Sequence, residues 1–168
     1  MTTSPQVFDA AELRRIASVL NTCIEACIDG QKIYAIAAAS VRRPNLKEML
    51  QHHSDQRATF VVQLQNAMKG LGATPENEGS FRGGARLHLM EARHVLELRH
   101  DDHSIVRQCV RDQEATVRHY VSAMAKIPFA KLPLDLRVLL DEQLGSITLT
   151  LEETRRHLDG WSGVAVSH

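Results

Sequence analysis

The chain has 168 residues, with 20 basic and 20 acidic side chains, 43% hydrophobic residues and 24% charged residues. This composition is typical of a soluble globular protein, and the length suits one domain with a hydrophobic core. The net charge of zero argues against nucleic-acid binding, which needs a basic surface, and no apolar run approaches the ~20 residues that span a bilayer. We therefore expect neither a nucleic-acid partner nor a membrane partner.

The start of the chain and the cysteine content both predict a cytoplasmic protein. Residues 1–6 have neither the basic end nor the apolar stretch of a signal peptide. The chain has three cysteines, an odd number that does not make a disulfide framework. We expect residues 1–168 to form a single domain with a frayed C-terminus.

Apolar residues recur at helical spacing in four long segments, and no stretch alternates with a period of two. These segments are predicted to be core helices at about residues 9–42, 44–71, 103–127 and 134–158. A capping box of Asp9 and Glu12 predicts the start of the first helix. Pro44 ends that helix and begins the second. The pair Asp101 and Asp102 caps the third.

The lengths of the connections predict the topology. Tight turns join the first helix to the second and the third to the fourth, so each pair is expected to be antiparallel. Residues 73–102 lie between the pairs and include a shorter predicted helix at about 85–99. A core helix of ~26 residues is ~39 Å long, and this segment is long enough to span it. The sequence therefore predicts an all-α, ferritin-like four-helix bundle with a long crossover between helices two and three. An up-down-up-down bundle with a decorated loop is the alternative.

The middle of the predicted bundle is polar. The inward stripes carry His53, Arg57, Gln113 and Gln143 at mid-height, while the carboxylates lie one position away from the stripes. Di-iron bundles place Glu and Glu-x-x-His side chains at this height, and uncharged amides are poor iron ligands. A hydrogen-bonded polar layer around His53 and Arg57 is the favoured interpretation.

A metal site in the bundle centre is the alternative, with iron, zinc or copper as its cofactor. The side chains to test as its ligands are Glu25, Asp29, His53, Glu114 and Glu142. No cofactor is expected under the favoured interpretation, and no catalytic residue can be assigned. The glycine-rich stretch 79–84 lacks the Lys-Ser/Thr ending of a P-loop.

Two further groups of metal-binding side chains occur. The stretch 88–103 contains four histidines and could hold Zn²⁺, Ni²⁺ or Cu²⁺ at the surface. Cys23, Cys27 and Cys109 are all predicted to face the interior, where a soft metal such as Cu(I) could bind. Core packing is the favoured role for these thiols, because buried free cysteine is a common core residue.

Several stretches of the chain resemble one known family. LNTCIEACIDGQ (residues 20–31), DQRATF (residues 55–60) and the stretch 101–120 are similar to a bacterial family of ferritin-like four-helix-bundle domains of unknown function. The resemblance extends from about Leu20 to His157. It implies the ferritin-like fold and supplies no activity.

The chain departs from this family where metal chemistry would matter. Gln31, Gln63 and Gln113 stand where the family usually has acidic residues. Residues 86–89 lack the family's His-Arg-x-Trp run, and residues 150–152 lack its histidine in the last helix. The metal chemistry that the superfamily suggests is therefore least supported in this chain.

These observations favour a non-enzymatic protein with a binding or a stress-associated structural role, forming a homodimer. A di-iron-type oxidase or metal-storage protein is the competing class. A third class is an interaction module, with an exposed apolar patch at Leu87, Met90 and Val95 on the short crossover helix.

Overall fold

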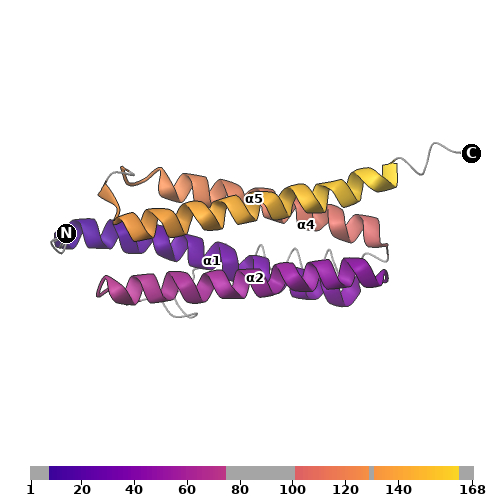
Figure 1. The fold of residues 1–168 in the computed structure, drawn as a ribbon, viewed down its shortest axis with the longest axis horizontal. Coiled ribbons are helices and arrows are strands. Elements are labelled where there is room, and N and C mark those ends of the chain that lie inside the picture. Colours follow the sequence, from indigo (N-terminus) through magenta and orange to yellow (C-terminus); the bar gives the residue numbers. More distant parts are fainter. Residues whose placement is uncertain (1–7, 75–100, 129–130, 163–168) are drawn as a thin grey trace, which may run out of the picture.

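The computed structural model of the chain describes residues 8–74, 101–128 and 131–162. These residues form four helices and no strand: α1 (Ala10–Ser40), α2 (Pro44–Gly70), α4 (Asp102–Met124) and α5 (Leu134–Ser162). The helices lie side by side in one elongated bundle (Figure 1). The predicted all-α four-helix bundle is confirmed. The short extra helix predicted at about 85–99 lies outside the described residues.

The start of α1 has the predicted cap. The Asp9 carboxylate accepts hydrogen bonds from the backbone amides of Ala11 and Glu12, each at 2.8 Å. The Glu12 carboxylate accepts in return from the Asp9 amide at 3.3 Å. This reciprocal arrangement satisfies amides that a helix start otherwise leaves unbonded.

Two helix ends differ from the prediction because of contacts between helices. The α1 helix ends at Ser40, and the amides of Arg42 and Arg43 donate to the Asp102 carboxylate at 2.8 and 3.1 Å. At the other end of the chain, α5 continues to Ser162. There the Trp161 ring packs under the Arg43 guanidinium, 4.5 Å from the ring centre, and meets His103 edge to face. These contacts of Trp161 with Arg43, which precedes α2, and with His103 of α4 stabilise the last turn of α5, beyond the predicted end at 158.

The same contacts determine the topology. Because Asp102 binds the turn that precedes α2, α4 begins at the end of the bundle where α2 begins. The two helices therefore run parallel, and the connection from Gly72 to Asp101 joins opposite ends of the bundle (Figure 1). The α1 helix packs between α2 and α4, and α5 packs mainly against α4. The long crossover is confirmed, and the up-down-up-down alternative is wrong.

A polar layer divides the core into two apolar clusters. One cluster includes Leu20, Phe60 and Leu140, and the other includes Leu50 and Val106. The polar layer consists of the buried hydroxyl groups of Tyr34 and Tyr120 and of the buried polar side chains His53, Ser54, Arg57, Asp112, Gln113, Thr116, Gln143, Thr150 and Thr154. None of the helices in the described part of the chain is both long and apolar enough to cross a membrane.

Candidate functional site

Arg57 is the most unusual member of the polar layer. Its side chain is 1% exposed, and it lies against the α1 backbone at Gly30, where a Cβ atom would be 3.5 Å from the guanidinium Nε. Its Nη1 donates to the Gln56 side-chain oxygen at 3.3 Å. Among the residues that the structure describes, Nε and Nη2 have no hydrogen-bond partner and no carboxylate forms an ion pair with the guanidinium. Within this part of the chain, the buried positive charge therefore has no paired counter-charge.

Aromatic rings provide part of the surroundings of this charge. The guanidinium carbon lies 5.7 Å from the centre of the Phe60 ring and 6.0 Å from that of the Tyr34 ring. Cation–π attraction of this kind contributes about 0.5–2 kcal/mol. Burying an ion costs on the order of several kcal/mol, so the rings offset only part of the cost.

His53 lies one helical turn before Arg57 and is also buried. Neither of its ring nitrogens has a hydrogen-bond partner among the described residues. Burial, and then the nearby Arg57 charge, lower the pKa of His53 to about 4. Its Nε2 lies 3.8 Å from a carboxylate oxygen of Glu153, whose side chain is 48% exposed. His53 is therefore a neutral ring at pH 7.

The first hydrogen-bonded chain of the layer joins α1, α4 and α5. The Tyr34 hydroxyl donates to the side-chain oxygen of Gln113. The amide nitrogen of Gln113 donates to the backbone oxygen of Ile147 at 3.0 Å. Burial raises the pKa of Tyr34 far above its usual value, so the phenol stays protonated.

The second hydrogen-bonded chain joins all four helices. The Tyr120 hydroxyl donates to the Gln143 side-chain oxygen at 3.0 Å, and the Gln143 amide donates to Gln63 at 2.8 Å. The Cys27 sulfur lies 2.9 Å from the Tyr120 oxygen. Because the Tyr120 proton goes to Gln143, the thiol of Cys27 is the donor to Tyr120.

The buried thiols are poor nucleophiles. Burial raises the pKa of Cys23 to about 12 and also raises the pKa of Cys27 and Cys109. The reactive form of cysteine is the thiolate, which these sites disfavour at pH 7. Cys23 and Cys27 lie in one apolar cluster and Cys109 in the other, so the three thiols do not share one site.

The five side chains predicted as metal ligands lie at different depths. Glu25 and Asp29 are half-buried on α1, and His53 is fully buried on α2. Glu114, 35% exposed, pairs with Arg155 at 2.6 Å, and Glu142 is exposed on α5. Within residues 8–74, 101–128 and 131–162, no three His, Cys, Asp or Glu side chains form a group that could hold a metal ion.

The residues present at the centre do not fit a di-iron site. Iron needs several anionic oxygen ligands, whereas the buried polar side chains of the described helices include a single carboxylate, that of Asp112, beside two amides, two protonated phenols and a neutral histidine. The unpaired Arg57 guanidinium would also repel a metal ion placed beside it.

The sequence predicted part of this layer and missed its pairing. His53, Arg57, Gln113 and Gln143 were all predicted to face inward, and all are buried. The contacts of the two tyrosines, and the part played by Gln63, were not predicted. A tyrosine on an apolar stripe is a usable signal, because a buried phenol needs a hydrogen-bond partner.

Other sequence features fall outside the described residues. These are the glycine-rich stretch 79–84, three of the four histidines of the stretch 88–103, and the apolar patch predicted at Leu87, Met90 and Val95. The fourth histidine, His103, packs against Trp161.

Comparison with known proteins agrees with the fold and supplies no activity. A family described as a domain of unknown function, DUF2383, matches residues 15–126. No curated protein matches the chain. A crystal structure titled "ferritin like, diiron-carboxylate proteins from Bacillus anthracis str. Ames" superposes with a TM-score of 0.66 at 18% identity, over 87% of this chain and 96% of that one. The chain therefore has the ferritin-like fold that the sequence predicted.

Proposed function

We propose a non-enzymatic role, either in binding or as a stress-associated structural protein, for this chain, which belongs to the DUF2383 family. The bundle centre of this protein is built around its own cation, Arg57, in place of a metal ion. The buried, unpaired guanidinium is the observation that carries the proposal. It supports a metal-free centre because two positive charges at that depth repel each other strongly.

The protonation states in the layer support the non-enzymatic role. A catalytic centre needs a group that gains or loses a proton near the working pH. The buried thiols and phenols have raised pKa values, and His53 has a lowered one. None of these groups is poised to titrate near pH 7.

A metal-binding function is the second candidate. Its support is the likeness in fold to a structure titled a diiron-carboxylate protein, together with the two unbonded ring nitrogens of His53. In this candidate Glu25, Asp29, His53, Glu114 and Glu142 are the ligands, and iron, zinc or copper is the metal. The helices would then have to move, because Glu114 is paired with Arg155 and Glu142 is exposed.

Elemental analysis of the untagged protein, purified without chelator, separates the two candidates. We expect iron, zinc and copper all far below one atom per chain. The His53→Ala variant is the test, and His52→Ala is its matched control because His52 is the exposed neighbour on the same helix. Near-stoichiometric metal that is lost in His53→Ala and kept in His52→Ala would overturn the proposal.

We also propose that the protein is a cytoplasmic homodimer that pairs through α5. Three of its large apolar side chains are exposed: Leu134 at 67%, Val138 at 46% and Leu149 at 66%. Exposed apolar surface concentrated on one helix is typical of an interface.

Light scattering coupled to size exclusion should give twice the 18.8 kDa chain mass, and Leu149→Glu should reduce the measured mass to that of one chain. A monomeric wild type would contradict this assembly.

A further inference from the structure

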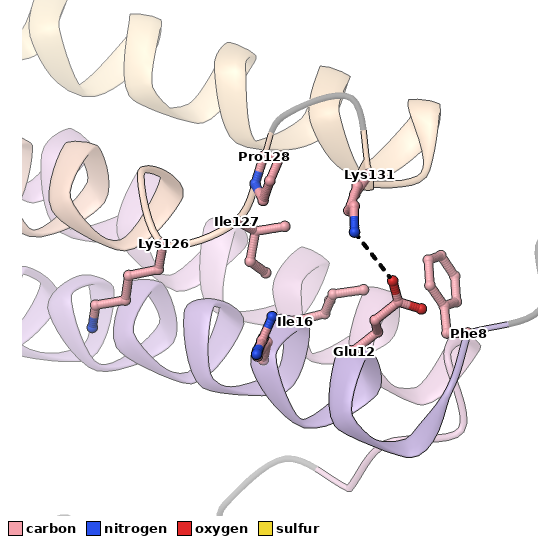
Figure 2. Close-up of a pocket in the computed structure, with 8 residues that line it drawn as sticks. Phe8, Glu12, Ile16, Lys126, Ile127, Pro128 and Lys131 are labelled. Atoms are coloured by element: carbon pink, nitrogen blue, oxygen red, sulfur yellow. Dashed lines mark ion pairs between the residues drawn. The ribbon is translucent and has the colours of Figure 1, made fainter.

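A small cavity opens at the end of the bundle where α1 begins. Its apolar walls are Phe8 and Ile16 from α1 and the residues before it, and Ile127 and Pro128 from the turn after α4. Figure 2 shows Ile16 and Ile127 lying close together, with Phe8 on the far side of Glu12. Ile16 and Ile127 also belong to the apolar core of this end of the bundle. We call this cavity the α1-end pocket.

The α1-end pocket has a cationic rim. Arg15, Lys126 and Lys131 line it together with a single acidic side chain, Glu12. Lys131 reaches toward Glu12 across the opening, with its ammonium nitrogen 3.8 Å from a carboxylate oxygen (Figure 2). Arg15 and Lys126 form no ion pair with any residue that the structure describes. The charges that line the pocket therefore sum to a positive value.

The acidic groups nearby are already engaged in the helix cap. The second oxygen of Glu12 accepts from the Asp9 amide, and the Asp9 carboxylate accepts from the amides of Ala11 and Glu12. The amides of Asp9, Ala11 and Glu12 at the start of α1 thus bond to carboxylates of the chain itself. The attraction for an anion comes from the basic side chains of the rim.

We propose that the α1-end pocket binds a small amphiphilic carboxylate, with a short alkyl group in the apolar cavity and the carboxylate between Arg15 and Lys126. The cavity volume of about 80 Å³ is roughly half of the ~150 Å³ that accommodates benzene in an engineered protein cavity. A linear or branched chain of a few carbon atoms therefore fits, and a long acyl chain does not. This site is separate from the polar layer, so it does not depend on whether the bundle centre holds a metal.

The test is a titration of the full ¹⁵N-labelled chain, followed by amide chemical shifts at constant ionic strength. The three probes share a four-carbon chain and differ in charge: butyrate, 1-butanol and n-butylamine. Butyrate should produce saturable shifts at residues 8–16 and 126–131, and butylamine should produce none. Butanol should bind at least about five-fold more weakly, the factor that one exposed charge contact supplies. Added salt should weaken the binding of butyrate.

A pair of charge-reversal variants locates the site. Lys126→Glu should raise the Kd for butyrate about five-fold or more, because it removes an attraction and adds a repulsion. Lys47→Glu makes the same exchange at an exposed position in the first turn of α2, at the other end of the bundle. It should leave the Kd unchanged within about two-fold. The proposal is overturned if butyrate gives no saturable shifts, if butanol or butylamine binds as well, or if the two variants behave alike.

Discussion

Two groups of side chains in the polar layer differ in how their polar atoms are bonded. The side chains of Tyr34, Gln113, Tyr120 and Gln143 form continuous hydrogen-bonded chains between helices. His53 and Arg57, one turn apart on α2, leave four buried nitrogens without a partner. A bonded polar group can stabilise a core, whereas an unbonded one weakens it. The two groups, although both are buried, therefore contribute to stability with opposite signs.

Breaking the bonded group should have the largest effect. Gln113→Leu leaves the Tyr34 hydroxyl buried without its acceptor and removes the second hydrogen bond to the Ile147 carbonyl, which keeps its bond within α5. We expect the free energy of unfolding to fall by about 2–4 kcal/mol, since the unsatisfied phenol costs about 1–3 kcal/mol and a lost hydrogen bond about 0.5–1.5 kcal/mol. Urea unfolding at pH 7 measures the change. Gln51→Leu, at an exposed position on α2, is the control and should stay within about 0.5 kcal/mol of wild type.

Acidification should lower the stability of the protein through His53, a member of the unbonded group. The pKa of His53 is lowered to about 4 in the fold, from 6.5 in the unfolded chain. Between these values the unfolded chain binds more protons, so the free energy of unfolding decreases as the pH falls. From pH 7 to pH 4.5 His53 should account for a loss of about 2–3 kcal/mol.

The variants His53→Gln and His52→Gln isolate this contribution. The first should flatten the pH dependence of unfolding over that range, and the second should leave it as in wild type. An equal pH dependence in all three proteins would mean that other groups cause it.

Removal of the buried cation should have a smaller effect of opposite sign. Arg57→Met keeps much of the side-chain volume and eliminates an unpaired charge. Replacing buried charges by apolar groups of similar size is often neutral or stabilising. We therefore expect the free energy of unfolding to stay unchanged or to rise by up to about 2 kcal/mol, which thermal unfolding measures as an unchanged or higher melting temperature. Arg118→Met, at an exposed position on α4, is the control. A marked loss of stability would mean that the guanidinium has a bonding partner in solution.

The smallest effect is expected at the edge of the unbonded group. Glu153→Gln removes the carboxylate that lies 3.8 Å from His53, but this side chain is half exposed. Because His53 is neutral at pH 7 and the carboxylate is half exposed, the free energy of unfolding should change by less than about 1 kcal/mol at that pH. Thermal unfolding of Glu153→Gln and wild type at pH 7 measures the difference. A loss as large as that of Gln113→Leu would show that His53 depends on this contact.

The sequence patterns predicted the helix ends correctly where residues of the same helix determine them. The capping box of Asp9 and Glu12 and the position of Pro44 were both predicted, and both are present. The predictions failed where distant residues act, at the end of α1, which contacts Asp102, and at the end of α5, which Trp161 extends. The contact of Arg42 with Asp102 joins residues 60 positions apart, and Trp161 and Arg43 lie farther apart still in the sequence, so no local pattern encodes these contacts.

For the candidate site, too, the sequence predicted the features that depend on one helix and missed those that depend on contacts between helices. Periodicity identified His53, Arg57, Gln113 and Gln143 as inward-facing, because it reports the direction of a side chain from its own helix. It could not pair Tyr34 with Gln113 or Cys27 with Tyr120, since those contacts depend on the rotation and height of one helix against another. The same limit explains why the α1-end pocket was not predicted.

The helices, their inward faces and the crossover follow from the amino-acid sequence, because apolar spacing, caps and connection lengths act through local geometry and chain reach. Which polar side chains are hydrogen-bonded depends on how the helices pack. That outcome depends on whether a partner from another helix comes within hydrogen-bond distance, and within the described residues His53 and Arg57 have buried nitrogens that no such partner reaches.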